Sequence, residues 1–354
     1  MKKKILALLF SFIMLFSLFS CGEKTVKRYD YDLSQYVDVG QIDPIRCKFV
    51  SPDVITEEDV DHAVFQIMLG YSAFEEKEGP AEQYDRVKAE YQILYEGEPI
   101  DEYSSSEYYI LIGYESGGDI DWLLGQALIG KNKGETASIT YTFPESDVSL
   151  GVWAGRTVEA TAKVLAVYDS HPPECTDEFV QNIGSFSFST VLDFRQQLRE
   201  DILDQREADK KEAVKNAFLN GVTVKKYPEA ELQAYVTRFL EEIKASAEEM
   251  DMTLSEYAKE YFDMTESELS RAAMEDAKER VKNDLACIQA SRLLKTTLTD
   301  EEYEAGLQRY FESEGKGFET VEDFEKYYTR DFMYESILWD KTFETLVEKA
   351  ENIA

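Results

Sequence analysis

The chain is poor in the side chains that most enzymes use for nucleophilic or metal chemistry. Its 354 residues include only two histidines, His62 and His171, which lie far apart and without the spacing of metal ligands. Three scattered cysteines, Cys47, Cys175 and Cys287, form neither a CxxC pair nor the framework of a disulfide-rich domain. We therefore expect no metal, no other cofactor and no histidine-based triad. We expect free thiols, while one disulfide remains an alternative outside the cytoplasm.

The fourth cysteine, Cys21, stands in a chemically distinctive place. Three lysines precede an almost unbroken apolar run from Ile5 to Phe19, which is short for a membrane-spanning helix and typical of a signal peptide. The sequence Leu18-Phe19-Ser20-Cys21 resembles the bacterial lipobox. This resemblance implies cleavage before Cys21 and a diacylglycerol on its thiol, whereas the alternative is an ordinary secretory signal with a stray cysteine. We expect an extracytoplasmic protein, anchored to a bacterial membrane through lipid on Cys21.

Composition excludes other kinds of partner. The formal net charge is −33, and such a surface repels phosphate backbones and anionic lipid headgroups. We therefore expect no nucleic-acid partner, and membrane attachment must come from the lipid. The hydrophobic content of 44% is ample for folded cores, so the high charge does not indicate disorder.

The hydrophobic period divides the remainder of the chain. Residues 42–50 are compatible with a strand, Thr56 begins a helix, and residues 75–85 have the composition of a solvated turn. From Arg86 apolar and polar residues alternate, which is typical of a half-buried strand. Three more strands are predicted at Glu107–Ile112, Thr136–Phe143 and Thr157–Val167. One helix is predicted at Trp122–Ile129.

Beyond Pro173 the hydrophobic period becomes helical. Helix starts are marked by Thr…Glu or Thr…Asp pairs that are typical of capping boxes, beginning at Thr253, Thr265, Thr299 and Thr320. The predicted fold is thus a multidomain α+β protein, with a small antiparallel sheet crossed by one helix and then an irregular all-α domain. The predicted boundaries are 1–20 for the signal peptide, 21–82 for a tether and linker strand-helix, 83–170 for the sheet domain and 171–354 for the helical domain.

Three blocks of sequence together resemble the trigger factor family. The first is TEEDVDHAVFQI, similar to the arm that leads into the isomerase domain of that family. The second is LIGKNKGETASITYTFPES with WAGRTVEATAKVLAV, which resembles the end of the FKBP-type domain. The third begins at ECTDEFV and continues through YPEAELQAYVTRFLEEI and MTESELSRAAMEDAKERVKNDLACIQA, in the order of the C-terminal helical domain. No basic, ribosome-docking module precedes Ile42, so we expect no ribosome partner.

The resemblance implies an FKBP-like peptidyl-prolyl isomerase module. Such catalysis needs an apolar surface that desolvates the imide and a few well-placed donors, but no nucleophile or metal. The residues that match the FKBP pattern are Tyr91, Asp101 as the acid, Tyr108, Ile120 and Leu124. The sequence departs from the family pattern at Ile100 and Ala160, which replace phenylalanine. It also departs at Asp121, which takes a position that is usually aliphatic.

The predicted function is a membrane-anchored folding factor for secreted polypeptides, both a peptidyl-prolyl cis-trans isomerase and a chaperone. Its partners would be unfolded or proline-containing polypeptides. The alternative is a pure holdase whose FKBP-like module is inactive. A solute-binding lipoprotein is disfavoured, because the alternating strands and helices of a two-lobed α/β protein are missing.

Overall fold

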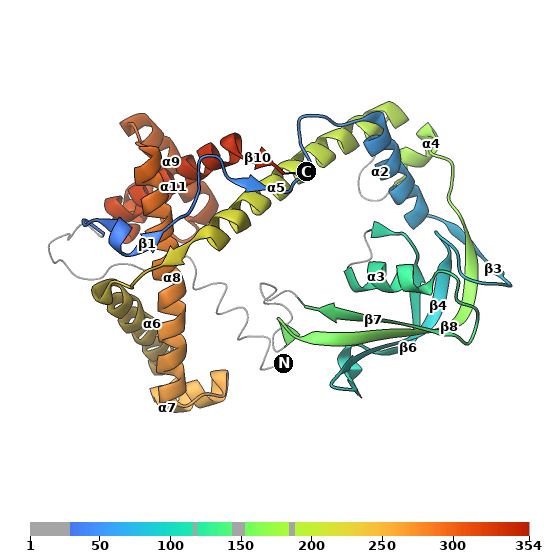
Figure 1. The fold of residues 1–354 in the computed structure, drawn as a ribbon, viewed down its shortest axis with the longest axis horizontal. Coiled ribbons are helices and arrows are strands. Elements are labelled where there is room, and N and C mark those ends of the chain that lie inside the picture. Colours follow the sequence, from blue (N-terminus) through green and yellow to red (C-terminus); the bar gives the residue numbers. More distant parts are fainter. Residues whose placement is uncertain (1–28, 116–118, 144–152, 184–187, 354) are drawn as a thin grey trace. The chain divides into compact units, whose positions relative to one another are not determined.

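A computed structural model describes residues 29–115, 119–143, 153–183 and 188–353 of the chain. Cys21 and the predicted signal peptide lie outside the described residues. The chain divides into two compact units: the sheet unit, residues 52–205, and the helical unit, which combines the segment up to Ser51 with Arg206 and everything after it (Figure 1). None of the described helices is both long enough and apolar enough to cross a lipid bilayer.

The sheet unit contains a six-stranded antiparallel sheet built around a long central strand, β8 (Thr157–His171). One edge of β8 pairs with β4 (Arg86–Tyr95), and its other edge pairs with β7 (Thr136–Thr142) and then β3 (Ala73–Lys77). The far edge of β4 pairs with β5 (Glu98–Pro99) and β6 (Ser105–Leu111). Residue 162 illustrates the register, because Ala162 lies between Tyr91 on one side and Ala137 on the other.

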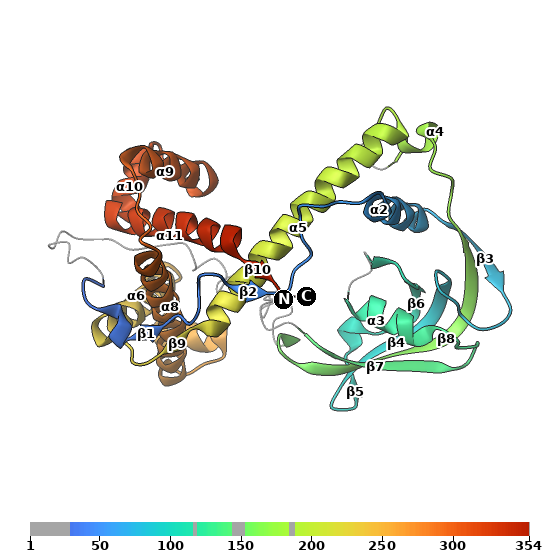
Figure 2. The same cartoon turned by 45° about the horizontal axis from the view of Figure 1, so that its top comes forward.

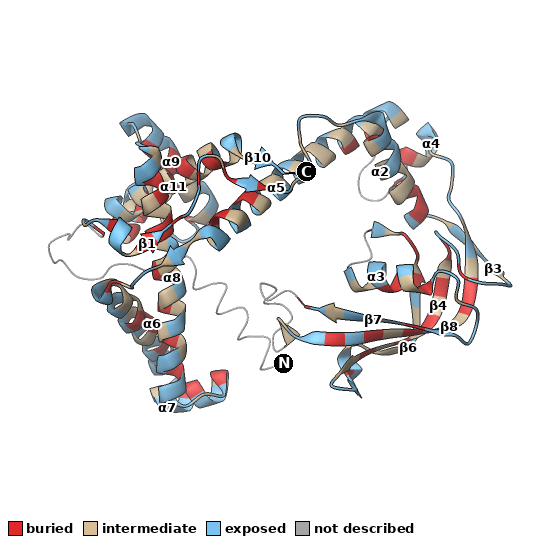
Figure 3. Cartoon of the chain, viewed as in Figure 1, coloured by how far each residue is buried: buried red, intermediate tan, exposed pale blue. Residues whose placement is uncertain are grey.

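The alternation in the sequence determines which face of the sheet is buried. Every second residue of β4 and β8 points into one core, as the red bands on these strands show in Figure 3. The predicted helix is present as α3 (Asp119–Leu128), and it lies over this face, with Leu124 and Leu128 fully buried in the same core (Figure 2). The predicted sheet crossed by one helix is therefore confirmed.

Two predictions for the segments before the sheet were wrong. Residues 75–77, predicted as part of a solvated turn, belong to β3 and pair with β8. Only Arg46–Cys47 of the predicted strand 42–50 is paired, as β2, with β10 (Glu351–Asn352). Neither β3 nor β2 shows an alternation of apolar and polar residues. Each is held by backbone pairing with a distant strand rather than by a buried face.

The sheet unit also contains a small helical cluster. Helix α2 (Glu57–Gly70) begins at the predicted Thr56, whose side chain and Asp59 form a reciprocal capping box. It packs with α4 (Asp177–Val180) and with the start of α5 (Val191–Gly221) through Met68, Val180 and Phe194.

Helices α7, α8, α9 and α10 of the helical unit begin at the threonines that the sequence predicts. The capping boxes at Thr253, Thr265 and Thr299 are all formed, and the hydroxyl of Thr320 caps its helix by accepting from the amide of Asp323. Each such cap satisfies an otherwise unpaired amide at a helix start. The helices are α6 (Glu229–Glu249), α7 (Leu254–Tyr257), α8 (Glu266–Leu294), α9 (Asp300–Glu314), α10 (Val321–Tyr328) and α11 (Arg330–Lys349), with a π-helical turn at Ala258–Phe262.

The segment predicted as a tether is part of the helical core. Its buried residues include Tyr29, Leu33 and Val37, which pack in one cluster with residues of α5, α8 and α11. The hydroxyl of Tyr29 donates to Asp284 at 2.8 Å, and β1 (Val37–Asp38) pairs with β9 (Thr223–Val224). The compact units thus assign residues 29–51 to the helical unit and residues 171–205 to the sheet unit, unlike the predicted boundaries. Irregularly spaced apolar residues show no period, so the sequence alone did not reveal this packing.

Candidate functional site

A cluster of two tyrosines and one aspartate lies under the first turn of α3. Tyr91 of β4 and Tyr108 of β6 stack with ring centroids 4.8 Å apart and ring planes at 30°. The hydroxyl of Tyr108 donates a hydrogen bond of 2.7 Å to Oδ2 of Asp121. We call Tyr91, Tyr108 and Asp121 the Tyr–Asp cluster. It joins two rigid strands to the beginning of the helix that covers them.

A second hydrogen bond of the same kind lies on the same helical turn. The hydroxyl of Tyr141, on β7, donates to Oδ2 of Asp119 at 3.1 Å. Carboxylates are favourable in the first turn of a helix, where the amide groups leave a partial positive charge. Asp119 is exposed, whereas Asp121 is partly buried. The two bonds position the N-terminal turn of α3 above β6 and β7.

Burial controls the protonation of the Tyr–Asp cluster. Burial raises the pKa of the Asp121 carboxyl, and the hydrogen bond from Tyr108 opposes that shift. Burial, together with the hydrogen bond to Asp121, raises the pKa of Tyr108 to about 12. Burial and then the charge of Asp121 also raise the pKa of Tyr91. Both phenols therefore remain protonated donors at neutral pH, and neither is activated as a nucleophile.

The structure brings four of the five predicted site residues together. Tyr91 and Leu124 are buried in the core of the sheet unit, and Tyr108 and Ile120 are half-buried against it. Asp101 instead lies exposed in a 3₁₀ turn, Asp101–Tyr103, that follows β5. The carboxylate beside the tyrosines is that of Asp121. The role of Asp101 as the site acid stays a prediction, and its position does not support it.

The sequence signal for Asp121 was misleading. An acid at a position that is usually aliphatic suggests, from the sequence alone, that an apolar site has been eroded. Asp121 lies on α3, and its hydrogen-bond partner Tyr108 lies on β6, 13 residues earlier in the chain. Such a pair becomes recognisable only when the packing of α3 against β6 is known.

Aromatic residues that the sequence analysis did not select line one end of the same core. Contacts join Tyr95 to Trp153, Tyr103 to Phe143 and Phe143 to Tyr141, with ring centroids 5.5, 6.3 and 5.5 Å apart respectively. These rings are mostly only partly buried. An apolar, partly accessible surface is therefore present although Ala160 replaces an aromatic residue. Ala160 itself is fully buried between Ile93 and Ile139 of the neighbouring strands.

The helical unit has its own accessible apolar surface, at the end of α6 and around α7. Four of the eight methionines of the chain lie there: Met250 is exposed, whereas Met252, Met264 and Met274 are half-buried against the core of α6, α7 and α8. Met250 is 51% exposed, and its sulfur accepts a hydrogen bond of 3.2 Å from the hydroxyl of Tyr261. Methionine side chains are flexible and polarizable, so they adapt to apolar partners of different shape. We call these four residues with Tyr261 the methionine surface.

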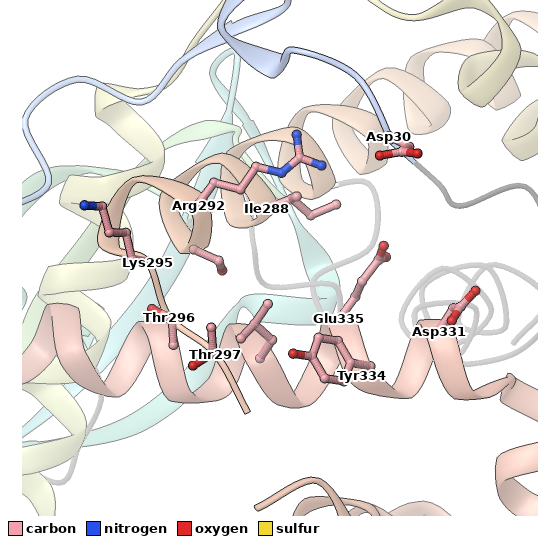
Figure 4. A pocket seen from close by; sticks show the side chains of 11 residues that line it. Asp30, Ile288, Arg292, Lys295, Thr296, Thr297, Asp331, Tyr334 and Glu335 are labelled. Atoms are coloured by element: carbon pink, nitrogen blue, oxygen red, sulfur yellow. The ribbon is translucent and has the colours of Figure 1, made fainter. Parts of the chain in front are cut away.

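A hollow of about 450 Å³ lies between the end of α8 and α11 in the helical unit (Figure 4). Its lining carries both charges, including Arg292, Lys295, Asp331 and Glu335. Arg292 donates to the backbone oxygens of Tyr29 and Tyr31 at 2.6 and 2.8 Å. The guanidinium of Arg292 therefore fastens the N-terminal segment to α8, which is a structural role. In the part of the chain that the structure describes, no three metal-ligating side chains come together.

Comparison with known proteins identifies related chains. The model of the family described as bacterial trigger factor protein C-terminus matches residues 192–348. The trigger factor of Caldicellulosiruptor bescii is 24% identical over 305 residues, covering 85% of this chain and 68% of that relative. The trigger factor of Limosilactobacillus fermentum is 25% identical over 274 residues, covering 76% and 61% respectively.

One solved structure, described as "Promiscuous Substrate Recognition in Folding and Assembly Activities of the Trigger Factor Chaperone", also matches. The match covers 88% of this chain and 72% of the other chain, with 20% sequence identity and a TM-score of 0.38.

Proposed function

We propose that this chain, whose residues 192–348 match the family model of the trigger factor C-terminus, is a folding factor that holds unfolded polypeptides and isomerises their X–Pro bonds. The two activities are assigned to different units. The helical unit, which contains nearly all of the family match, would hold clients. The sheet unit would act on X–Pro bonds through the surface around the Tyr–Asp cluster.

The observation that carries the holding role is the methionine surface. Exposed apolar side chains are attracted to the apolar segments of an unfolded chain, and the gain is roughly 25 cal/mol for each Å² of apolar surface removed from water. Flexible methionines accommodate many segments without a fixed shape. The many surface carboxylates keep the chaperone itself soluble while clients are bound.

The holding role is tested with the full chain, because residues 29–51 pack in the core of the helical unit and a fragment that begins at residue 171 lacks them. The chain should delay aggregation of a chemically unfolded protein, and high salt should not abolish the delay. A variant with Met250→Ser, Met252→Ser and Met264→Ser should lose most of the delay. Leu192→Ser is the matched control, because Leu192 is 75% exposed and lies in the sheet unit. Equal delay by the two variants would contradict the assignment.

Isomerase activity in the sheet unit is supported by the chemistry of its apolar face. Rotation about an X–Pro bond has a barrier of about 20 kcal/mol, and desolvation of the imide lowers the double-bond character that opposes rotation. The aromatic rings around Tyr103 and Phe143 supply an apolar environment, and the protonated phenol of Tyr91 would supply a donor, since the Tyr108 hydroxyl already donates to Asp121. We expect a rate below that of a typical FKBP, and a preference for a bulky apolar residue before the proline.

A protease-coupled assay on a series of X–Pro peptides tests this activity. Tyr108→Phe removes the hydroxyl but keeps the ring stack, so it should lower kcat/KM several-fold. No rate above background for the unmodified chain would leave the sheet unit as a scaffold, and the pure holdase would be the function.

Export and lipid anchoring at Cys21 form a separate part of the proposal, which is supported by the lysines, the apolar run and the lipobox resemblance. A diacyl anchor places two chains in the bilayer, which gives stable attachment where one chain exchanges. A chain anchored in this way would act on secreted polypeptides. Expressed with residues 1–20, the protein should partition into the detergent phase, whereas Cys21→Ala should remain in the aqueous phase. Identical partitioning of the two would refute lipidation.

A further inference from the structure

We propose that Met250 is a reversible oxidation site, through which hydrogen peroxide weakens the holding of clients by the helical unit. This inference rests on the proposed holding role of the methionine surface, and it adds a means of regulation to that surface. The reaction transfers one oxygen atom from the peroxide to the sulfur of Met250. The residues that carry the inference are Met250 and Tyr261, whose hydroxyl already lies at that sulfur.

Exposure distinguishes Met250 from the other methionines. The structure describes six of the eight methionines of the chain, since Met1 and Met14 lie outside the described residues. Met250 is 51% exposed, whereas Met68 and Met333 are 3% and 1% exposed. The other three methionines of the methionine surface are half-buried. A thioether reacts only where the oxidant reaches its sulfur, and a buried one reacts only after local opening. We therefore expect Met250 to react first.

The sulfur of Met250 lies beside a hydroxyl whose position is well defined. Met250 ends α6, and its amide donates to the carbonyl oxygen of Ala247 at 3.1 Å. Tyr261 lies in the π-helical turn, and its ring stacks on that of the buried Tyr257, with centroids 4.4 Å apart and planes at 27°. Its hydroxyl donates to the Met250 sulfur at 3.2 Å. Single π-helical turns recur at functional sites. A fixed donor is thus in place beside the atom that is oxidised.

The chemistry requires only the thioether and the peroxide. A thioether sulfur has two lone pairs, of which one accepts from Tyr261 and the other attacks an oxygen of the peroxide. The S–O bond forms as the O–O bond breaks, and the departing oxygen takes up the proton of the transferred oxygen, so the products are a sulfoxide and water. The sulfur loses two electrons, which the peroxide gains. Hydrogen peroxide is uncharged, so the net charge of −33, which repels anionic oxidants, does not hinder it.

Oxidation changes the exposed part of the methionine surface from apolar to polar. The sulfoxide oxygen is a strong acceptor within reach of the Tyr261 hydroxyl, so the side chain becomes held as well as polar. Met250 is the most exposed methionine of this surface, and it therefore supplies apolar area that a client contacts. A polar group there reduces the gain from removing apolar area from water. Methionine sulfoxide reductases restore the thioether, which makes the change reversible.

The competing explanation is that peroxide simply damages the helical unit. A sulfoxide inside a core disrupts its packing, so damage of this kind lowers stability together with activity. Met250 lies beyond the last turn of α6 with half of its surface in water. Its oxidation should therefore reduce client holding without changing the denaturant concentration at the midpoint of unfolding. Stability and holding are thus two readouts that separate regulation from damage.

The experiment treats the full chain with increasing hydrogen peroxide and then removes the oxidant. Peptide mapping by mass spectrometry measures the sulfoxide at each methionine, and Met250 should be oxidised about tenfold faster than Met68 or Met333. At the dose that oxidises Met250 alone, the delay in aggregation of a chemically unfolded protein should shorten about two- to fivefold. The midpoint of unfolding should stay the same, and treatment with methionine sulfoxide reductases should restore the delay.

Two variants connect the loss of holding to one sulfur. Met250→Leu has an apolar side chain without sulfur, and Met264→Leu is the matched control on the same surface. Each variant is compared with its own untreated sample. Peroxide should leave the delay of Met250→Leu unchanged relative to that sample, whereas Met264→Leu should lose as large a fraction as the unmodified chain does. An equal fractional loss in Met250→Leu would overturn the inference.

Three further results would also overturn the inference. They are equal oxidation rates at Met250 and Met333, selective oxidation of Met250 that leaves the delay unchanged, and a midpoint of unfolding that falls together with the delay. If the untreated chain delays no aggregation, the proposed holding role fails. The peptide map then still tests Met250 as the oxidation site, and the assigned effect on holding is overturned with the holding role.

Discussion

The two units of this protein present apolar surface in different ways. In the sheet unit, aromatic rings and protonated phenols are positioned by strands whose register leaves them little freedom. In the helical unit, the accessible apolar groups are flexible methionines at a helix end. Fixed donors suit a reaction that needs one geometry, and adaptable side chains suit clients of many shapes. The comparison is consistent with the proposed division of the chain into a catalytic module and a general holding surface.

The largest expected effect comes from replacing one core leucine in each unit by alanine, which tests the two units one at a time. Leu124 in the sheet unit and Leu285 in the helical unit are both fully buried. Each leucine-to-alanine change should lower the free energy of unfolding of its own unit by about 2–5 kcal/mol, through lost burial and the cavity that remains. Denaturant unfolding followed by circular dichroism measures this loss.

The same variants compare the activities of the two units. Leu124→Ala should reduce isomerisation more than aggregation delay, and Leu285→Ala should do the reverse. If both activities fall together in both variants, the units do not work separately and the comparison fails.

A smaller effect is expected for Ala160→Phe. The resemblance to FKBP-type domains suggests that phenylalanine here would complete an aromatic wall and raise the rate. Ala160 is fully buried between Ile93 and Ile139, so a ring at this position would have to displace its neighbours. We therefore expect a loss of about 1–3 kcal/mol in unfolding free energy from overpacking, without a gain in rate. Ala160→Val is the milder control. A faster and equally stable Ala160→Phe variant would show that this side chain faces the client.

The smallest expected effect is a pH dependence that belongs to Asp121. Because its folded-state pKa is raised, the folded protein binds this proton more readily than the unfolded chain does. The resulting stabilisation is present at acidic pH and is lost as pH rises through the folded pKa. The stability of the unmodified chain relative to Asp121→Asn should therefore fall between acidic and neutral pH. A pH series of thermal unfolding measures this difference, and a difference that is independent of pH would contradict the burial of the charge.

Local signals in the sequence predicted most elements correctly. The four Thr-based helix starts depend on atoms three residues apart, and the alternation of Val87, Ala89 and Tyr91 depends on neighbours along one strand. Such patterns are visible without a structure, because the interacting groups are close in the chain.

The candidate site could be predicted only in part. Tyr91, Tyr108, Ile120 and Leu124 lie in or against one core, and their role as site residues stays a prediction from the family resemblance. Asp121 was interpreted as a defect, and the exposed Asp101 was chosen as the acid. The difference depends on how β6 approaches the first turn of α3, which no local pattern specifies.

The sequence by itself determined the helix starts, the buried face of the sheet and the separation into a β-rich and a helical part, since each depends on short-range period and capping. Only the tertiary structure decided that residues 29–47 complete the helical core, that β3 joins the sheet, and that Asp121 meets Tyr108. These are contacts between residues far apart in the chain, where Tyr29 and Asp284 stand 255 positions from each other. The free energy of these contacts depends on burial and pairing in the folded molecule. Neither the composition nor the hydrophobic period of the sequence contains that information.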